Sequence, residues 1–185
     1  MNWKFRHLTR KSDALLAFVG WLVLLALLSP SCAARADIHL AVLPGSIEQQ
    51  PGDTFTVELT ITAAGSEFNA YDAVLAFDKT CLTFLQMSPL SAQEGPLMTE
   101  ACGNRWHIFN IAPDSAFVVI NHSLLCPGTT VTGPGVVYRL QFRCGPHNVD
   151  TEFRLLENTV FYDNGLYVTP VITADAHVRI GTGTG

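Results

Sequence analysis

Residues 54–62 read TFTVELTIT, and apolar and polar side chains alternate without interruption along them. In an extended chain Phe55, Val57, Leu59 and Ile61 would face one side, while threonine and glutamate side chains would face the other. This period of two residues, rich in β-branched side chains, is typical of a strand with one buried face. We therefore predict a β-strand here whose apolar side belongs to a core.

Further short strands are predicted on both sides of this one, separated by residues with turn composition, at 38–43, 69–77, 82–87, 105–111, 116–123, 136–144, 152–156, 159–162, 166–173 and 177–180. A four-residue turn is expected at 112–115, a tight turn at Asp163-Asn164-Gly165, and a polar loop at 88–104. No stretch of ten or more residues after Ala36 has a helical period. These features favour an all-β sandwich over residues 37–180, followed by a flexible Gly/Thr tail at 181–185.

The first 36 residues have the composition of a secretory signal. Residues 1–13 carry four basic side chains, and residues 14–28 are almost entirely apolar. This apolar run is shorter than the roughly 20 residues that a transmembrane helix needs. Small residues at Ala34 and Ala36 suit cleavage between Ala36 and Asp37. We expect a secreted or extracytoplasmic protein with no stable membrane insertion; the alternatives are an uncleaved anchor and a lipid on Cys32.

The charge distribution argues against a nucleic-acid partner. Residues 37–185 contain six basic and fifteen acidic side chains, a net charge of −9. A domain this acidic would be repelled by a phosphate backbone, and by an anionic membrane surface for the same reason.

Four cysteines remain after the expected cleavage, and an even number in an oxidising compartment indicates two disulfides. A zinc site is the competing interpretation, but the paired C-x-x-C spacing is absent. If Ile111 and Ala116 close the turn at 112–115, Cys102 faces Leu125, next to Cys126. We therefore predict a Cys102–Cys126 disulfide, and elimination leaves Cys81–Cys144 as the second. The alternation of side chains argues against the second bond. Cys144 faces inward with Leu140 and Phe142 of its strand, whereas Cys81 would face the side opposite to its neighbour Leu82.

No catalytic constellation is recognisable. The sequence contains neither a G-x-S-x-G nor an H-E-x-x-H motif, and its histidines follow no ligand spacing. Asp163-Asn164-Gly165 lacks the alternating acids of a calcium loop. We expect a protein that is not an enzyme and has no cofactor or metal of its own.

The segment FNAYDAVLAFDKTCLTFLQM, residues 68–87, resembles the signature of cohesin domains, in which a strand ending in an aromatic-Asp pair leads into a Leu-containing strand. The matching residues are Phe77-Asp78 and Leu82. PGDTFTVELTI upstream, and residues 135–142 and 160–164 downstream, resemble other cohesin strands in the expected order. The resemblance implies a nine-stranded jelly-roll β-sandwich, a fold shared with some carbohydrate-binding modules. It also implies that the strand after Asp78 meets the end of the strand at Cys144, which supports the second disulfide.

Cohesins bind dockerins, calcium-loaded modules on partner proteins, so the resemblance implies a dockerin-bearing protein partner. In the family dockerins lie on the exposed face of the sheet that holds the strand at 69–77. Tyr71, Ala73, Leu75 and Phe77 have inward parity. The expected contact residues are the outward side chains of this strand and two histidines of neighbouring strands: Ala70, Asp72, Val74, Ala76, His107 and His122. The alternative is a sheet face without a binding role.

Polysaccharide binding is the second functional hypothesis, because sugar rings stack on exposed aromatic side chains. Trp106 is the single tryptophan after the signal, and a core position is an equally good interpretation of it. Tyr71, Tyr138, Tyr162 and Tyr167 mostly share the parity of core positions. A purely structural domain of a cell-surface assembly is a third hypothesis. Asn121-His122-Ser123 matches the acceptor pattern for N-glycosylation.

Overall fold

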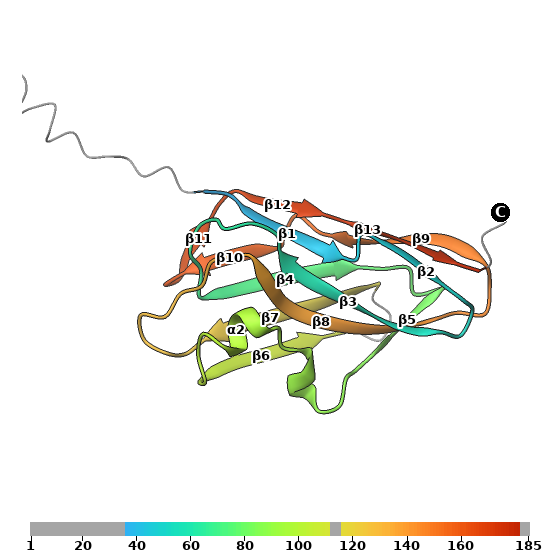
Figure 1. Cartoon of the computed structure of the whole chain (residues 1–185), viewed down its shortest axis with the longest axis horizontal. Helices are drawn as coiled ribbons and strands as arrows, with labels where there is room; N and C mark the ends of the chain where they lie inside the picture. Colours follow the sequence, from blue (N-terminus) through green and yellow to red (C-terminus); the bar gives the residue numbers. More distant parts are fainter. Residues whose placement is uncertain (1–35, 112–115, 182–185) are drawn as a thin grey trace, which may run out of the picture. The chain divides into compact units, whose positions relative to one another are not determined.

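The structure is a computed structural model that describes residues 36–111 and 116–181. Its strands form two sheets, and the first has five strands in the order β12-β1-β3-β8-β5 (Figure 1). All neighbours in this sheet are antiparallel except β12 and β1, which run parallel. The bounds are β1 (Ile38–Leu43), β3 (Thr54–Ile61), β5 (Leu82–Leu85), β8 (Gly135–Cys144) and β12 (Val171–Ala174).

The second sheet has eight strands and branches at its central strand, β4 (Ala70–Ala76). On one edge β4 pairs with β10 near its start and with β9 near its end, and on its other edge it pairs with β7. β6 pairs with β7 and with no other strand of the described residues, so it is an edge strand. The remaining bounds are β2 (Ser46–Gln49), β6 (Arg105–Asn110), β7 (Phe117–Leu124), β9 (Val149–Leu155), β10 (Val160–Asp163), β11 (Leu166–Val168) and β13 (Ala176–Ile180).

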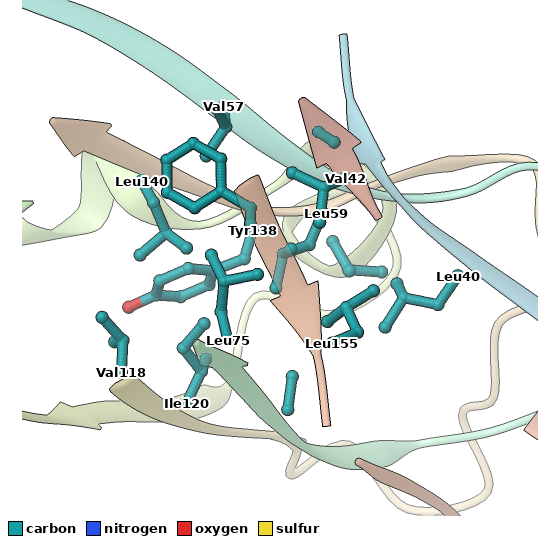
Figure 2. Close-up of a cluster of buried hydrophobic side chains, with 14 of the residues drawn as sticks. Leu40, Val42, Val57, Leu59, Leu75, Val118, Ile120, Tyr138, Leu140 and Leu155 are labelled. Atoms are coloured by element: carbon teal, nitrogen blue, oxygen red, sulfur yellow. The ribbon is translucent and has the colours of Figure 1, made fainter. Parts of the chain in front are cut away.

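The core lies between the two sheets, and the alternating pattern at 54–62 is confirmed there. Phe55, Val57, Leu59 and Ile61 are buried, whereas the polar residues between them are exposed or half-buried. Figure 2 shows Val57 and Leu59 of the first sheet on the opposite side of the core from side chains of the second sheet such as Leu75, Val118 and Ile120. Tyr138 extends its ring into the same space. The all-β sandwich is therefore confirmed.

The described residues contain thirteen strands, more than the nine that the family resemblance implies. Two very short connections carry the chain from the first sheet to the second. At Pro44-Gly45 it leaves β1 of the first sheet and enters β2 of the second, a strand that the sequence analysis missed. At Asp175 it passes from β12 to β13 in the same way. The predicted strand at 166–173 is divided between β11 and β12, because Pro170 lies between them and cannot donate to a ladder.

The segment from 88 to 104, predicted as a polar loop, includes two short helices, η1 (Leu90–Gln93) and α2 (Pro96–Thr99). Each has four residues, which is too short to produce a recognisable helical period. Gly95 separates them and lies so close to the β8 backbone at Val136 that any side chain there would collide with it. None of the helices within residues 36–111 and 116–181 has the length and apolar character to cross a membrane.

The tight turn predicted at 163–165 is confirmed. It joins β10 to β11, and Asn164 and Gly165 both have positive φ angles, 50° and 82°. The predicted turn at 112–115, the signal at 1–35 and the last residues of the tail, 182–185, lie outside the described residues. The division into signal, sandwich and tail stays a prediction.

The predicted Cys102–Cys126 disulfide is confirmed, with 6.0 Å between the two Cα atoms. The predicted register of the hairpin was wrong, since β6 and β7 pair His107 with His122, two residues from the expected alignment. A shift of two residues leaves every side chain of the two strands on its expected face. Both registers place Cys126 one position from the residue opposite Cys102, so the cysteines still meet.

The predicted Cys81–Cys144 disulfide is wrong, because both residues are free, buried thiols. The ladder pairs Leu82 with Cys144, so Cys81 precedes the regular pleat by one residue. Its thiol instead lies 3.5 Å from the carbonyl oxygen of Asp78. Burial raises the pKa of both thiols.

Candidate functional site

The outer face of the second sheet, formed by β10, β4, β7 and β6, brings together side chains that are far apart in the sequence. The ladders align Trp106 with Ser123, Ser123 with Ala70, and Ala70 with Tyr162. A second row aligns Ile108, Asn121, Asp72 and Val160. We call this surface the outer face.

A hydrogen-bonded carboxylate occupies its centre. Asp72 Oδ1 accepts a hydrogen bond of 2.6 Å from Asn121 Nδ2, and Asp72 Oδ2 accepts one of 2.9 Å from the Tyr162 hydroxyl. Partial burial, together with this bond to Asp72, raises the pKa of Tyr162 to about 12. No lysine or arginine of the described residues forms an ion pair with Asp72. Asn121 and Tyr162 therefore orient the Asp72 carboxylate, but no lysine or arginine of the described residues neutralises its charge.

Large apolar side chains are exposed on the same face as this carboxylate. Trp106 is 50% exposed, Ile108 45%, Phe117 41% and Tyr167 63%. Tyr167 packs beside Tyr162, with 5.2 Å between the ring centroids. Scattered apolar residues are normal on a protein surface, but several on one sheet face around a polar centre are typical of an interaction surface.

Three of the four β4 residues predicted for this face lie on it: Ala70, Asp72 and Ala76 are half-buried with outward side chains. Val74 was predicted there but is only 4% exposed, so it offers no contact surface. The connection between β9 and β10 bonds to its backbone at the edge of β4. Leu156 N donates to the Val74 carbonyl oxygen at 2.9 Å, and Val74 N donates to Thr159 Oγ1 at 3.1 Å.

The placement of His107 and His122 on the outer face is wrong, because both side chains point into the sandwich. His122 pairs with Tyr71, an inward residue of β4, and His107 pairs with His122. Ladder partners share a face, so all three point inward. The His122 side chain has no exposed surface, and that of His107 has 13%.

These histidines belong to a buried polar cluster around Glu94, one of the two residues between η1 and α2. Arg105 contacts the Glu94 carboxylate through both Nε and a terminal nitrogen. His122 Nε2 lies 3.3 Å from Glu94 Oε2, and His107 Nε2 lies 3.6 Å from Glu94 Oε1. Tyr138, from β8, reaches His107 Nδ1 at 3.1 Å and accepts a bond of 3.4 Å from Gln93. The cluster ties the segment at 88–104 to three strands.

Burial dominates the electrostatics of this cluster. It lowers the pKa of His122 to about 4, although the negative charge of Glu94 acts in the opposite direction. It raises the pKa values of Tyr71 and Tyr138, which are further raised by Glu94. At neutral pH His122 is therefore uncharged, and the charge of Glu94 is balanced by Arg105. No group of three or more metal-ligating side chains is arranged to hold a metal within the part of the chain that the structure describes.

Trp106, the predicted sugar-stacking residue, lies on the outer face and not in the core. The sequence does not predict Ile108, Phe117 and Tyr167 on this face, and the parity of Tyr162 and Tyr167 wrongly suggests core positions. Their positions follow from the pairing of β6, β7, β10 and β11 around β4, which a single sequence does not reveal. Once Trp106 faces outward, the alternation within β6 places Ile108 beside it. Asn121, of the glycosylation pattern, lies on this face and donates to Asp72.

The fold defined by these sheets is that of cohesin domains. No protein-family model matches the chain, and no curated protein matches it in sequence. Solved structures match over most of its length. A non-cellulosomal cohesin from the archaeon Archaeoglobus fulgidus superposes with a TM-score of 0.61 at 18% identity, covering 80% of this chain and 93% of that one. The cohesin-like fold implied by residues 68–87 is thus confirmed.

Two bacterial structures give similar agreement. CaCohA2 from Clostridium acetobutylicum superposes with a TM-score of 0.62 at 15% identity, covering 82% of this chain and 94% of that one. A chain of a type I cohesin–dockerin complex from Clostridium thermocellum superposes with a TM-score of 0.59 at 19% identity, covering 80% and 97%. At these identities the likeness establishes the fold, and function has to be argued from the site.

Proposed function

We propose that this protein is a secreted, non-enzymatic binding or assembly module of cohesin type, which recognises a protein partner through the outer face. One observation carries the proposal. Trp106, Ile108 and Phe117 are exposed on the same face as the oriented carboxylate of Asp72, and this face is built from four paired strands. Exposed aromatic and aliphatic side chains around a polar centre are the kind of groups that dominate the energy of protein interfaces.

The partner that fits this surface is a dockerin-bearing protein. The fold supports this, since a structure that it resembles is a type I cohesin–dockerin complex. The chemistry of the face sets requirements of its own. A partner has to cover apolar surface on β6 and present a hydrogen-bond donor or a cation to Asp72, because no cation of the described residues neutralises it.

A matched pair of isoleucines tests the face. Ile108 lies on the outer face and is 45% exposed, and Ile172 lies on β12 of the other sheet and is 44% exposed. Calorimetry measures binding to a panel of purified calcium-loaded dockerin modules for three proteins: the wild type, Ile108→Ala and Ile172→Ala. We expect Ile108→Ala to weaken binding by about tenfold or more and Ile172→Ala to leave it unchanged. Equal effects of the two substitutions, or no binding to any dockerin, would contradict the proposal.

Polysaccharide binding is the second candidate function, and the exposure of Trp106 on a sheet face favours it. Affinity electrophoresis on cellulose, xylan and chitin separates the two. Retardation of the wild type that disappears in Trp106→Ala, without dockerin binding, would establish the sugar-binding alternative.

A further inference from the structure

The Glu94 cluster lies directly beneath the outer face, on the same strands. Along β6 the outward side chains Trp106 and Ile108 alternate with the inward side chains Arg105 and His107. Along β7, His122 points inward between two outward residues. A change in the cluster therefore acts on the strands that carry the exposed side chains.

The contacts of the Tyr71 hydroxyl favour one tautomer of neutral His122. The Tyr71 hydroxyl donates its one proton to the carbonyl oxygen of Val137, at 3.1 Å. It can therefore only accept at its second contact, which is His122 Nδ1 at 3.4 Å. Neutral His122 then carries its proton on Nδ1, and its unprotonated Nε2 faces Glu94 Oε2 at 3.3 Å without a hydrogen bond.

The Glu94 carboxylate is the shared partner of the three basic side chains in this cluster. Glu94 faces Arg105 and His107 from β6 and His122 from β7, while Tyr71 and Tyr138 complete the ionisable groups around it. Arg139 of β8 reaches only the Glu94 carbonyl oxygen, at 3.2 Å, and pairs with Glu58. At neutral pH Glu94 Oε2 is bonded to Arg105 Nε. A proton added to His122 Nε2 would make it a second, charged donor to that same oxygen atom.

Competition between Arg105 and His122 for Glu94 Oε2 would act mainly on the position of β6. Its ladder to β7 is its one strand pairing within the described residues, and no strand covers its outer edge. The Cys102–Cys126 disulfide holds the chain just before it. Beyond that point, Arg105 and His107 attach the inner side of β6 to Glu94.

We propose that proton uptake at His122 Nε2 transfers Glu94 Oε2 from Arg105 to His122, which releases β6 and makes the outer face acid-sensitive. The proton comes from solvent, and the net charge of Glu94, Arg105 and His122 changes from zero to +1. Arg105 then keeps, on Glu94, only its contact of 3.3 Å to Oε1, favours an arrangement in which it reaches water, and β6 moves with it. The effect on partner binding rests on the proposed function, whereas the release of β6 does not.

Hydrogen exchange measured by mass spectrometry tests the release without any partner. Protection factors of the purified full protein are compared at pH 7.0 and 4.5 after correction for intrinsic rates. We expect β6 and residues 88–104 to lose protection by about tenfold or more at pH 4.5 beyond any loss in β3, whose protection follows the free energy of unfolding at that pH. His122→Gln should abolish the loss, and His177→Gln, at an exposed position on β13, should not.

Three results would overturn the proposal: unchanged protection of β6, an equal loss in His122→Gln, or a uniform loss that includes β3. If His122→Gln does not fold, Glu94→Gln tests the same contact. It should lower β6 protection already at pH 7.0, and wild-type protection in this variant would also overturn the proposal.

The consequence for binding is measured separately, with a dockerin that binds the wild type at pH 7.0. We expect a larger loss of affinity at pH 4.5 for wild type than for His122→Gln, by about fivefold or more. Comparing the two proteins cancels titration of the dockerin itself. If no dockerin binds at any pH, the proposed function fails while the exchange result stands on its own.

Discussion

His122 Nε2 lies 3.3 Å from Glu94 Oε2 in the interior of the sandwich, and the geometry does not make this contact a hydrogen bond. In the proposed exchange, the protonation state of His122 Nε2 determines whether Glu94 Oε2 bonds to Arg105 or to His122. We expect neutral His122 to be the Nδ1–H tautomer, because the Tyr71 hydroxyl can only accept from it. Long-range ¹H–¹⁵N correlation spectra at pH 7 report the tautomer, and a spectrum of the Nε2–H form would contradict this assignment.

Acid should destabilise the fold through the same residue. The pKa of His122 is about 4 in the folded protein against 6.5 in an unfolded chain, so the unfolded state binds the proton more readily. The stability contributed by neutral His122 is therefore complete above about pH 6.5, falls as the pH is lowered, and is lost below about pH 4. Urea unfolding should show a free-energy loss of roughly 3 kcal/mol across this range from His122. His122→Gln should have a smaller pH dependence, and an unchanged dependence would contradict the prediction.

Breaking the buried ion pair should cost far more than breaking an exposed one. Glu94→Gln leaves the mostly buried Arg105 without its counter-charge, and we expect a loss of about 3 kcal/mol in the free energy of unfolding. The Arg179–Asp150 pair is the matched control, because both of its side chains are more than half exposed. Asp150→Asn should cost less than about 1 kcal/mol. Chemical denaturation of both variants gives the comparison, and equal losses would show that the cluster contributes no more than a surface pair.

The disulfide should stabilise the domain, and the second pair of cysteines should remain reduced. Cys102 and Cys126 are 24 residues apart, so their bond should contribute about 3 kcal/mol in the chain-entropy model. Peptide mapping without reduction should show one linked pair, with free thiols at Cys81 and Cys144. Linked peptides that join Cys81 to Cys144 would overturn this assignment.

The sequence predicted the sandwich well because the evidence for it is local. The alternation at 54–62 and the Asn164-Gly165 turn depend on neighbouring residues alone, and both are present in the structure. The site was predicted less well because it depends on which strands pair. The alternation within β4 correctly places Asp72 on the outer face. The inward direction of His107 and His122 depends on how β6 and β7 pair with β4, which the sequence does not reveal. Val74 has the outward parity that was predicted but is buried, and parity does not report burial.

The cleavage site predicted between Ala36 and Asp37 has a structural consequence. The Ala36 carbonyl oxygen accepts hydrogen bonds from Ser66 N at 3.2 Å and from Ser66 Oγ at 2.5 Å. Cleavage after Ala36 removes both bonds, which should cost about 1–2 kcal/mol at this exposed position. Thermal unfolding of chains that begin at Ala36 and at Asp37 measures the difference, with Ser66→Ala in each chain as the control.

If the bonds to Ala36 stabilise the domain, Ser66→Ala should lower the unfolding temperature of the longer chain and leave the shorter one nearly unchanged. The same change in both chains would assign the effect of Ser66 to other contacts.

Intact-mass measurement of the exported protein then identifies the natural start. We expect a mass that begins at Asp37. A mass that retains residues 1–36, or a lipid on Cys32, would contradict the predicted signal, and a start a few residues earlier would show that processing preserves the Ala36–Ser66 contact.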